Sequence, residues 1–193
     1  MRVVSQELTG DIAPLLQRLP ANPITFLRHG EGIVGIGEHT RLTSTGPNRF
    51  AELSAAWLEL VAEAEVIDEV NLPGSGLLAF GAIAFADSST SESRLIVPRV
   101  VLGHRDGRNW ITSIDGASLE DLNSDAAPLL ASNQSLAEPL AQGSLSRSGF
   151  KQAVASAIEA IAADRVEKVV LARDLVAPLA EDFDIRNPLI ALA

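Results

Sequence analysis

Residues 164–173 read Asp-Arg-Val-Glu-Lys-Val-Val-Leu-Ala-Arg, and the interpretation of the whole chain depends on this stretch. It is rich in β-branched and aliphatic residues and contains neither Gly nor Pro. It comes directly after a segment with helical periodicity, so it predicts a buried strand. Alternate residues of a strand share a face, which would place Lys168 beside Val166, Val170 and Ala172. An ammonium group among aliphatic side chains is poorly solvated, which favours loss of its proton.

Lysine is scarce in this chain. Lys151 and Lys168 are the only two, and arginine carries nearly all the other positive charge. Arginine keeps its proton, whereas a desolvated lysine can lose one and act as a base. A structural interpretation competes with the catalytic one, because Lys168 could extend from a strand end to water with its stem on apolar surface. Spacing alone favours the structural interpretation somewhat.

Residues 168–173, KVVLAR, resemble the signature strand of the chorismate-utilising enzymes, in particular the isochorismate synthases. The preceding residues agree with this resemblance. A serine cap at Ser146 or Ser148, an early Phe150 and an amphipathic helix come before the lysine stretch, in the order seen at the start of that family's catalytic region. The resemblance implies that chorismate is the substrate and that Lys168 is the general base that activates water. Anthranilate synthases typically carry glutamine there, whereas salicylate synthases keep the lysine and stay an alternative.

The resemblance also implies that the chain is the N-terminal part of a longer isochorismate synthase. In that family the carboxylates that hold Mg²⁺ and the glutamate that acts as general acid come later, so we expect them beyond Ala193. We therefore expect these 193 residues to be inactive alone. The whole enzyme would serve menaquinone or siderophore biosynthesis. A non-catalytic α+β binding module that has kept the strand signature is the alternative from another class.

Composition excludes several classes of protein. The net charge is −10 and no basic patch stands out, so neither a nucleic acid nor an anionic membrane is an expected partner. The absence of cysteine excludes a disulfide framework and a thiolate metal site, and agrees with a reducing compartment. No secretory signal and no apolar run of bilayer length is found, so a cytoplasmic protein is expected.

The patterning predicts an α+β fold, with an antiparallel or mixed sheet and helices packed on its outside, as in the N-terminal part of the chorismate-utilising enzymes. We expect a sheet-and-helix region over residues 1–143 and the start of the catalytic region over residues 144–193. Residues 115–143 are expected to be a long surface connection. Expected helices cover residues 11–19, 47–66 and 150–161, with another beginning at 187–188, and expected strands cover residues 2–4, 23–29, 77–86, 94–102 and 110–114. Asp106-Gly107 predicts a hairpin turn into the strand at 110–114.

Two of the expected strands carry further predictions. Residues 77–86 are continuously apolar, which predicts a central strand covered on both faces. Pro98 places the strand at 94–102 at an edge or a bulge. In the helix at 47–66, Arg49, Phe50 and Trp57 resemble an RF pair and tryptophan of the isochorismate synthases, and the helical spacing of Trp57 predicts a core residue.

Three other patterns could indicate a cofactor or metal site, and another interpretation is favoured for each. Gly30, Gly32 and Gly35 match the GxGxxG dinucleotide fingerprint, but the residues that follow predict a strand and not the helix that the fingerprint needs, so a hairpin is favoured. The histidines lie apart without ligand spacing, which argues against zinc. Asp182 and Asp184 could hold a metal, although solvated loop charges are the favoured interpretation.

Overall fold

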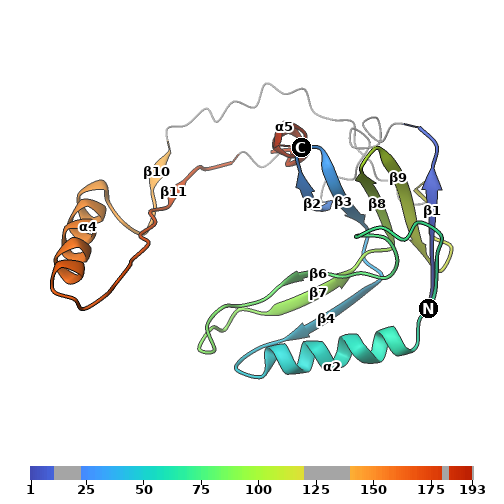
Figure 1. The fold of residues 1–193 in the computed structure, drawn as a ribbon, viewed down its shortest axis with the longest axis horizontal. Helices are drawn as coiled ribbons and strands as arrows, with labels where there is room; N and C mark the ends of the chain where they lie inside the picture. Colours follow the sequence, from blue (N-terminus) through green and yellow to red (C-terminus); the bar gives the residue numbers. More distant parts are fainter. Residues whose placement is uncertain (11–22, 120–139, 180–182, 193) are drawn as a thin grey trace. The chain divides into compact units, whose positions relative to one another are not determined.

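The computed structural model describes residues 1–10, 23–119, 140–179 and 183–192. The chain divides into two compact units: unit 1 comprises Met1–Leu130 and Asp184–Ala193, and unit 2 comprises Ala131–Phe183. Multi-stranded sheets and few helices confirm the predicted α+β class (Figure 1). The predicted division at residues 143 and 144 stays a prediction. No helix within the described residues is long and apolar enough to cross a membrane.

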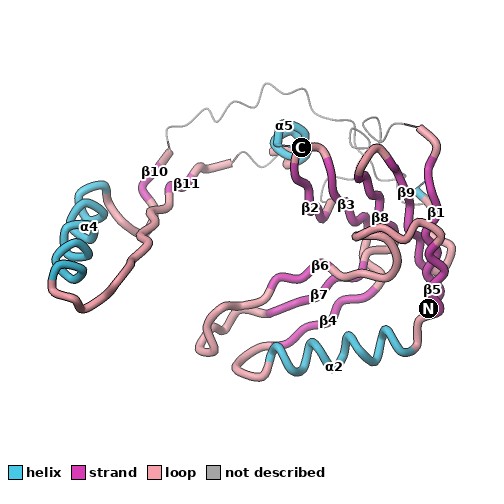
Figure 2. The backbone as a smooth tube through the Cα atoms, viewed as in Figure 1, coloured by secondary structure: helices cyan, strands magenta, loops and turns pink. Residues whose placement is uncertain are grey.

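A six-stranded sheet forms the larger part of unit 1. Its strand order is β2-β3-β8-β9-β1-β5, and all neighbours are antiparallel except β1 and β5, which are parallel. Figure 2 shows β5 beside β1, at one edge of this sheet. The strands are β1 (Arg2–Leu8), β2 (Ile24–Arg28), β3 (Glu31–Ile36), β5 (Glu65–Asp68), β8 (Val100–Arg105) and β9 (Arg108–Ile114).

A smaller antiparallel sheet of unit 1 has the order β4-β7-β6 and is covered by the helix α2 (Arg49–Ala62). Figure 1 shows α2 running along β4. Trp57 and Leu60 of this helix pack against a buried cluster formed by Val3, Val97 and Ile114, which confirms Trp57 as a core residue. The strands are β4 (Thr40–Ser44), β6 (Phe80–Ala82) and β7 (Ser93–Val97).

The two sheets of unit 1 share a pair of bent strands. β3 continues into β4, and β7 continues into β8, and backbone hydrogen bonds cross the bend from His39 N to the Val97 carbonyl (2.8 Å) and from Arg99 N to the Ile36 carbonyl (3.2 Å). Pro98 lies between β7 and β8, where its missing backbone N–H does not interrupt the hydrogen bonds of either strand. The predicted strand over 94–102 is therefore two strands with the proline at their break.

Both predicted hairpin turns are confirmed. His29 and Gly30 join β2 to β3 with φ values of 54° and 80°, and Asp106 and Gly107 join β8 to β9 with 50° and 73°. Two consecutive positive φ values are the signature of the tight turn that matches the twist of a hairpin. The glycine pattern after residue 30 thus belongs to β3, and the rejection of a dinucleotide fingerprint was correct.

The predicted central strand over residues 77–86 is wrong. Only Phe80–Ala82 forms a strand, β6, and it lies at the edge of the three-stranded sheet. Phe85 is 99% exposed. The interleaved Ala and Gly residues have too little side chain to form a two-sided core. After β6 the backbone bonds to side chains instead of a strand ladder: Arg49 of α2 donates to the carbonyls of Ala84 and Phe85, and Ala84 N donates to Ser93 Oγ of β7.

Within its described residues, unit 2 contains one helix and one pair of two-residue strands. The helix α4 (Arg147–Ala162) agrees with the predicted helix, and Ser146 caps it by accepting a hydrogen bond from Gly149 N at 3.0 Å. The strands β10 (Ala141–Gln142) and β11 (Leu175–Val176) pair antiparallel. The helix α5 (Arg186–Leu192), predicted from residue 187 onward, belongs to unit 1. The expected helix at 11–19 and most of the expected connection at 115–143 lie outside the described residues.

Candidate functional site

The segment that carries Lys168 joins α4 to β11 in unit 2. It has neither helix nor strand structure between residues 163 and 174, and Lys168 is exposed. Val166, Val169 and Leu171 are also exposed, and Val170 is 82% exposed. The predicted buried strand is therefore wrong for the described residues, and the flanking valines do not remove the ammonium group from water.

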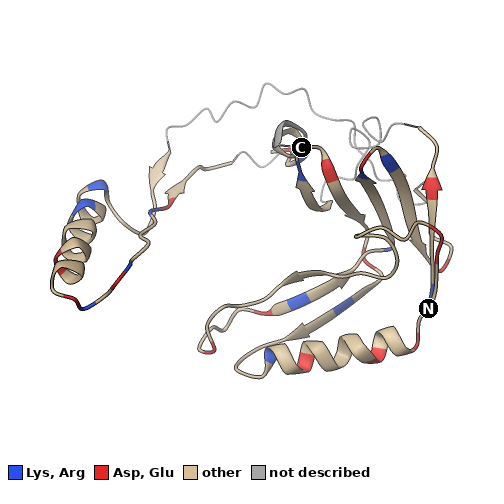
Figure 3. Ribbon diagram, in the orientation of Figure 1, with Lys and Arg blue, Asp and Glu red and all other residues tan. Residues whose placement is uncertain are grey.

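The reason for this difference is the absence of a partner strand. A strand is stabilised by ladder hydrogen bonds and by burial of at least one face. The only strands described in residues 140–179 are β10 and β11, and they pair with each other. β-branched sequence gives the segment a preference for extended backbone, but the preference cannot bury its side chains. Figure 3 shows acidic and basic positions alternating along this segment, as the sequence 164–168 requires.

One buried polar atom lies at the end of the same segment. Nε of Arg173 is buried and has no hydrogen-bond partner. A buried donor without an acceptor costs about 1–3 kcal/mol. The exposed aliphatic residues of the segment, by contrast, would be buried by a surface that covers it.

The helix α4 also exposes apolar side chains to solvent. None of its residues is buried, and Ile158 of the predicted apolar stripe is 62% exposed. Apolar residues at helical spacing normally face a core. Within the described part of unit 2, the helix and the lysine segment thus both present apolar side chains to solvent.

A cluster of hydrogen bonds ties the two ends of this region together. Ser144 donates to the Asp174 carboxylate from its backbone N, at 2.9 and 3.1 Å, and from Oγ, at 2.6 Å. These bonds lower the pKa of Asp174, with Ser144 Oγ as the largest cause. No sequence pattern identifies this pair, because its members lie 30 residues apart in the chain.

In unit 1, the buried side chain of Arg49 makes four hydrogen bonds. It is 1% exposed and donates to the carbonyls of Ala84 (2.6 Å), Phe85 (2.7 Å) and Gly46 (2.9 Å), and to Asp87 Oδ1 (2.7 Å). The sequence singled out Arg49 by resemblance alone. Its bonds show a structural role, since the guanidinium fixes the loop after β6 to the start of α2.

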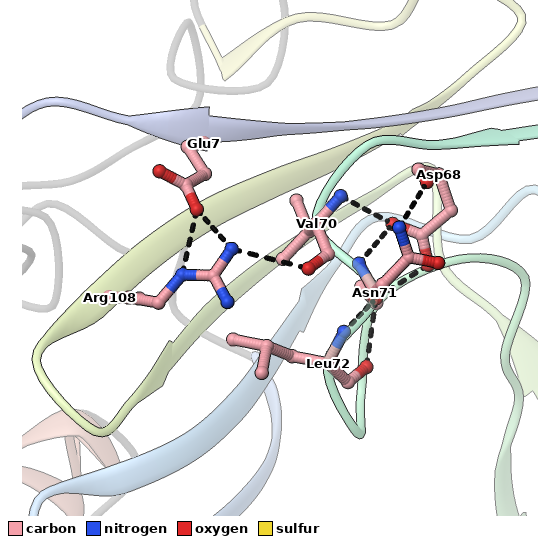
Figure 4. Close-up of polar contacts among 7 residues, drawn as sticks. Glu7, Asp68, Val70, Asn71, Leu72 and Arg108 are labelled. Atoms are coloured by element: carbon pink, nitrogen blue, oxygen red, sulfur yellow. Dashed lines mark hydrogen bonds and ion pairs between the residues drawn. The ribbon is translucent and has the colours of Figure 1, made fainter.

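A second polar cluster of unit 1 organises the turn after β5 (Figure 4). Asp68 Oδ1 accepts from Val70 N at 3.0 Å and Asn71 N at 3.1 Å, and Arg108 bridges Glu7 and the Val70 carbonyl. Every one of these groups has a protein partner. The cluster is therefore a stabilised turn and offers no free acid or base.

Among the described residues, those considered as metal ligands do not form a metal site. No group of three or more His, Asp or Glu side chains comes together within the described residues. Asp184 is 7% exposed, and its Oδ1 accepts a hydrogen bond from Arg186 Nε at 2.8 Å. The interpretation of Asp184 as a solvated loop charge is therefore wrong. Asp182 lies outside the described residues. The described side chains thus do not fit Mg²⁺, and no chemical step is assigned to it.

The histidines lie apart, as the sequence indicates. His29 occupies a hairpin turn, and His104 Nδ1 bonds Asn109 Oδ1 at 2.6 Å. His39 contacts Asp115 Oδ2 through Nε2 at 3.1 Å and Thr40 Oγ1 through Nδ1 at 2.8 Å. His39 precedes β4 and Asp115 follows β9, so this contact joins the two sheets of unit 1.

Comparison with known protein families finds a match. A family model described as "Chorismate binding enzyme" covers residues 17–193, which includes Lys168 and Asp174. Neither the comparison with curated proteins nor the comparison with solved structures found a match.

Proposed function

This chain belongs to the chorismate-binding enzyme family, and from that premise we propose that its complete gene product converts chorismate to isochorismate with Lys168 as the general base. One observation carries the proposal: KVVLAR at residues 168–173 lies inside the matched range and resembles the signature strand of the isochorismate synthases. The resemblance assigns the lysine of that strand to water activation.

The proposed reaction conserves the composition of the substrate. Lys168 Nζ, in its neutral form, takes a proton from water, and the oxygen of that water forms a bond to C2 of the ring. The ring double bond shifts, the C4–oxygen bond breaks, and a general acid protonates the departing hydroxyl group. The resemblance implies a glutamate for that acid. Mg²⁺ stays an expectation of the resemblance.

The base must be neutral to act, and burial is what favours the neutral form of a lysine. The side chains that would surround the amine are aliphatic and exposed in the described residues. The proposal therefore requires that the surface around Val166 and Val170 be covered when the reaction takes place. Such covering would also provide the apolar environment that general-base catalysis by lysine needs.

Replacement of Lys168 tests the proposal in the complete gene product. General-base catalysis contributes about 10²–10⁴-fold, so Lys168→Ala should lower the turnover of chorismate by that factor. Lys151→Ala is the matched control, because Lys151 is the other lysine, is exposed and lies on α4 of the same unit. Near-normal turnover by Lys168→Ala would remove Lys168 from the role.

Product analysis of the wild-type protein distinguishes the alternatives. Isochorismate supports the proposal. Salicylate with an equal amount of pyruvate would assign a salicylate synthase, which keeps the same lysine. Binding of chorismate without any product would assign a binding module.

A further inference from the structure

The two ends of the helix-and-lysine region meet at one carboxylate. Ser144 stands just before α4, and Asp174 stands just after the KVVLAR residues. Three donor–acceptor contacts of 2.6, 2.9 and 3.1 Å join them. Next to these contacts, β10 and β11 add the pairs Ala141–Val176 and Gln142–Leu175. The helix and Lys168 are therefore enclosed in one loop that closes at Asp174.

Gly143 shows how closely the two strands approach. A Cβ at this position would lie 2.1 Å from Asp174 Oδ2 and 2.2 Å from its Cγ. Atoms at such distances overlap, so only glycine leaves room for the carboxylate. The carboxylate is thus held in a defined position, by Ser144 on one side and by the bare Gly143 backbone on the other.

The strand pairing alone is too short to close the loop. Each strand has two residues, and an isolated two-stranded hairpin is at best marginally stable in water. Hydrogen bonds to an ionised acceptor are roughly twice as strong as neutral ones. The Asp174 carboxylate is accordingly the strongest contact between the two ends of the loop.

We propose that Asp174 is a positioning residue for the reaction, which fixes the segment bearing Lys168 to the start of α4 and so sets where the amine meets the substrate. The inference rests on the proposed function of Lys168. It goes beyond that function because it assigns a role to a residue that neither the sequence pattern nor the family match identifies. Asp174 touches no reacting atom and acts through the backbone it holds.

Two variants of the complete gene product test the contact between Asp174 and Ser144 itself. Asp174→Asn keeps the size of the side chain but removes its charge and replaces one acceptor with a donor that faces Ser144. Gly143→Ala leaves the charge in place and displaces it by steric overlap. Asp164→Asn is the matched control, because it makes the same chemical change on an exposed residue before Lys168, at a φ of 54° that asparagine tolerates.

Hydrogen exchange of residues 141–144 and 175–176, which carry the strand pairs and the Ser144 N–H bond, gives the first readout. Asp174→Asn and Gly143→Ala should accelerate exchange there on the order of tenfold, the change expected when charge-assisted hydrogen bonds are lost. Asp164→Asn should leave the exchange rates unchanged. Unchanged exchange in both test variants would overturn the inference, whether or not chorismate is the substrate.

Kinetics give the second readout, which separates positioning from loss of folded protein. With a displaced base, Asp174→Asn should bind chorismate normally and keep its KM, while kcat falls on the order of tenfold. A small primary amine added to the assay should restore part of kcat, as it should for Lys168→Ala, because it can replace a misplaced base. Faster exchange with normal kcat would overturn the positioning role.

The failure of the proposed function is distinguishable from the failure of this inference. If the wild-type protein converts no chorismate, the proposed function fails and the positioning role fails with it. Hydrogen exchange would still decide whether Asp174 ties the two ends together. If Lys168→Ala is inactive but Asp174→Asn is fully active, the proposed function stands and the positioning role is overturned.

Discussion

Substitution of Gly103 by alanine tests the packing of the six-stranded sheet. Gly103 in β8 pairs directly with Trp110 in β9, and the indole lies across the glycine. A Cβ on residue 103 would lie 2.0 Å from Trp110 Cε2 and 2.1 Å from Cζ2. Trp110 is fully buried, and its Nε1 donates to the Gly74 carbonyl at 3.3 Å. The ring has to move, because the atoms that meet the new methyl group are in its rigid body.

The magnitude of the effect follows from what the ring loses. Overfilling a packed core costs about 1–3 kcal/mol, and complete loss of a buried Trp side chain costs about 3–5 kcal/mol. Alanine regains about 0.5–1 kcal/mol of backbone entropy relative to glycine. We therefore expect Gly103→Ala to lower the free energy of unfolding by about 2–4 kcal/mol. This is a large fraction of the total free energy of unfolding of a typical protein, which is about 5–15 kcal/mol.

Denaturant unfolding followed by tryptophan fluorescence is the assay. Trp57 and Trp110 are the only tryptophans and both lie in unit 1, so the signal reports on that unit. Gly81→Ala is the control, because its Cβ would meet only the flexible end of Leu95, at 3.1 Å. An unchanged unfolding midpoint in Gly103→Ala, or an equal loss in both variants, would refute the packing of Trp110 on Gly103.

Two further predictions concern polar contacts of unit 1. Arg49→Met removes four buried hydrogen bonds and should destabilise the unit by about 2–4 kcal/mol in the same assay, whereas the exposed Arg94→Met should have little effect; equal losses would contradict the anchoring role of Arg49. The backbone N–H of Arg2 and, to a lesser extent, His39 hold the pKa of Asp115 below its usual range. Its contribution to stability is thus complete above the unfolded value of about 3.9 and is lost as the pH falls through the lower folded value, so Asp115→Asn should flatten the pH dependence of stability below about pH 4. A variant that loses stability with acid as steeply as the wild type would contradict that contribution.

The sequence predicted the elements that depend on local chemistry. The turn at His29-Gly30, the turn at Asp106-Gly107 and the serine cap of α4 each follow from a few adjacent residues, and all three are confirmed. The apolar period of α2 likewise predicted that Trp57 belongs to the core. In these cases the information lies within one turn of helix or one hairpin.

The errors occur where the outcome depends on a distant partner. β-branched sequence at 166–171 predicts extended backbone, but it cannot supply the strand that would pair with it. The apolar run at 77–86 predicts burial, yet Arg49 takes the carbonyls of Ala84 and Phe85 from another element. The Asp174–Ser144 contacts join residues 30 apart in the sequence, which no local pattern encodes. The burial of Asp184 is a different case, because its partner Arg186 is only two residues away.

The origin of the product oxygen tests the central claim most directly. The complete gene product would be incubated with chorismate in ¹⁸O-labelled water, and the product analysed by mass spectrometry. If Lys168 activates water for addition at C2, the wild-type protein yields isochorismate with one solvent oxygen at C2, and Lys168→Ala yields almost none. Isochorismate without solvent oxygen, or labelled isochorismate formed equally well by Lys168→Ala, would contradict the account.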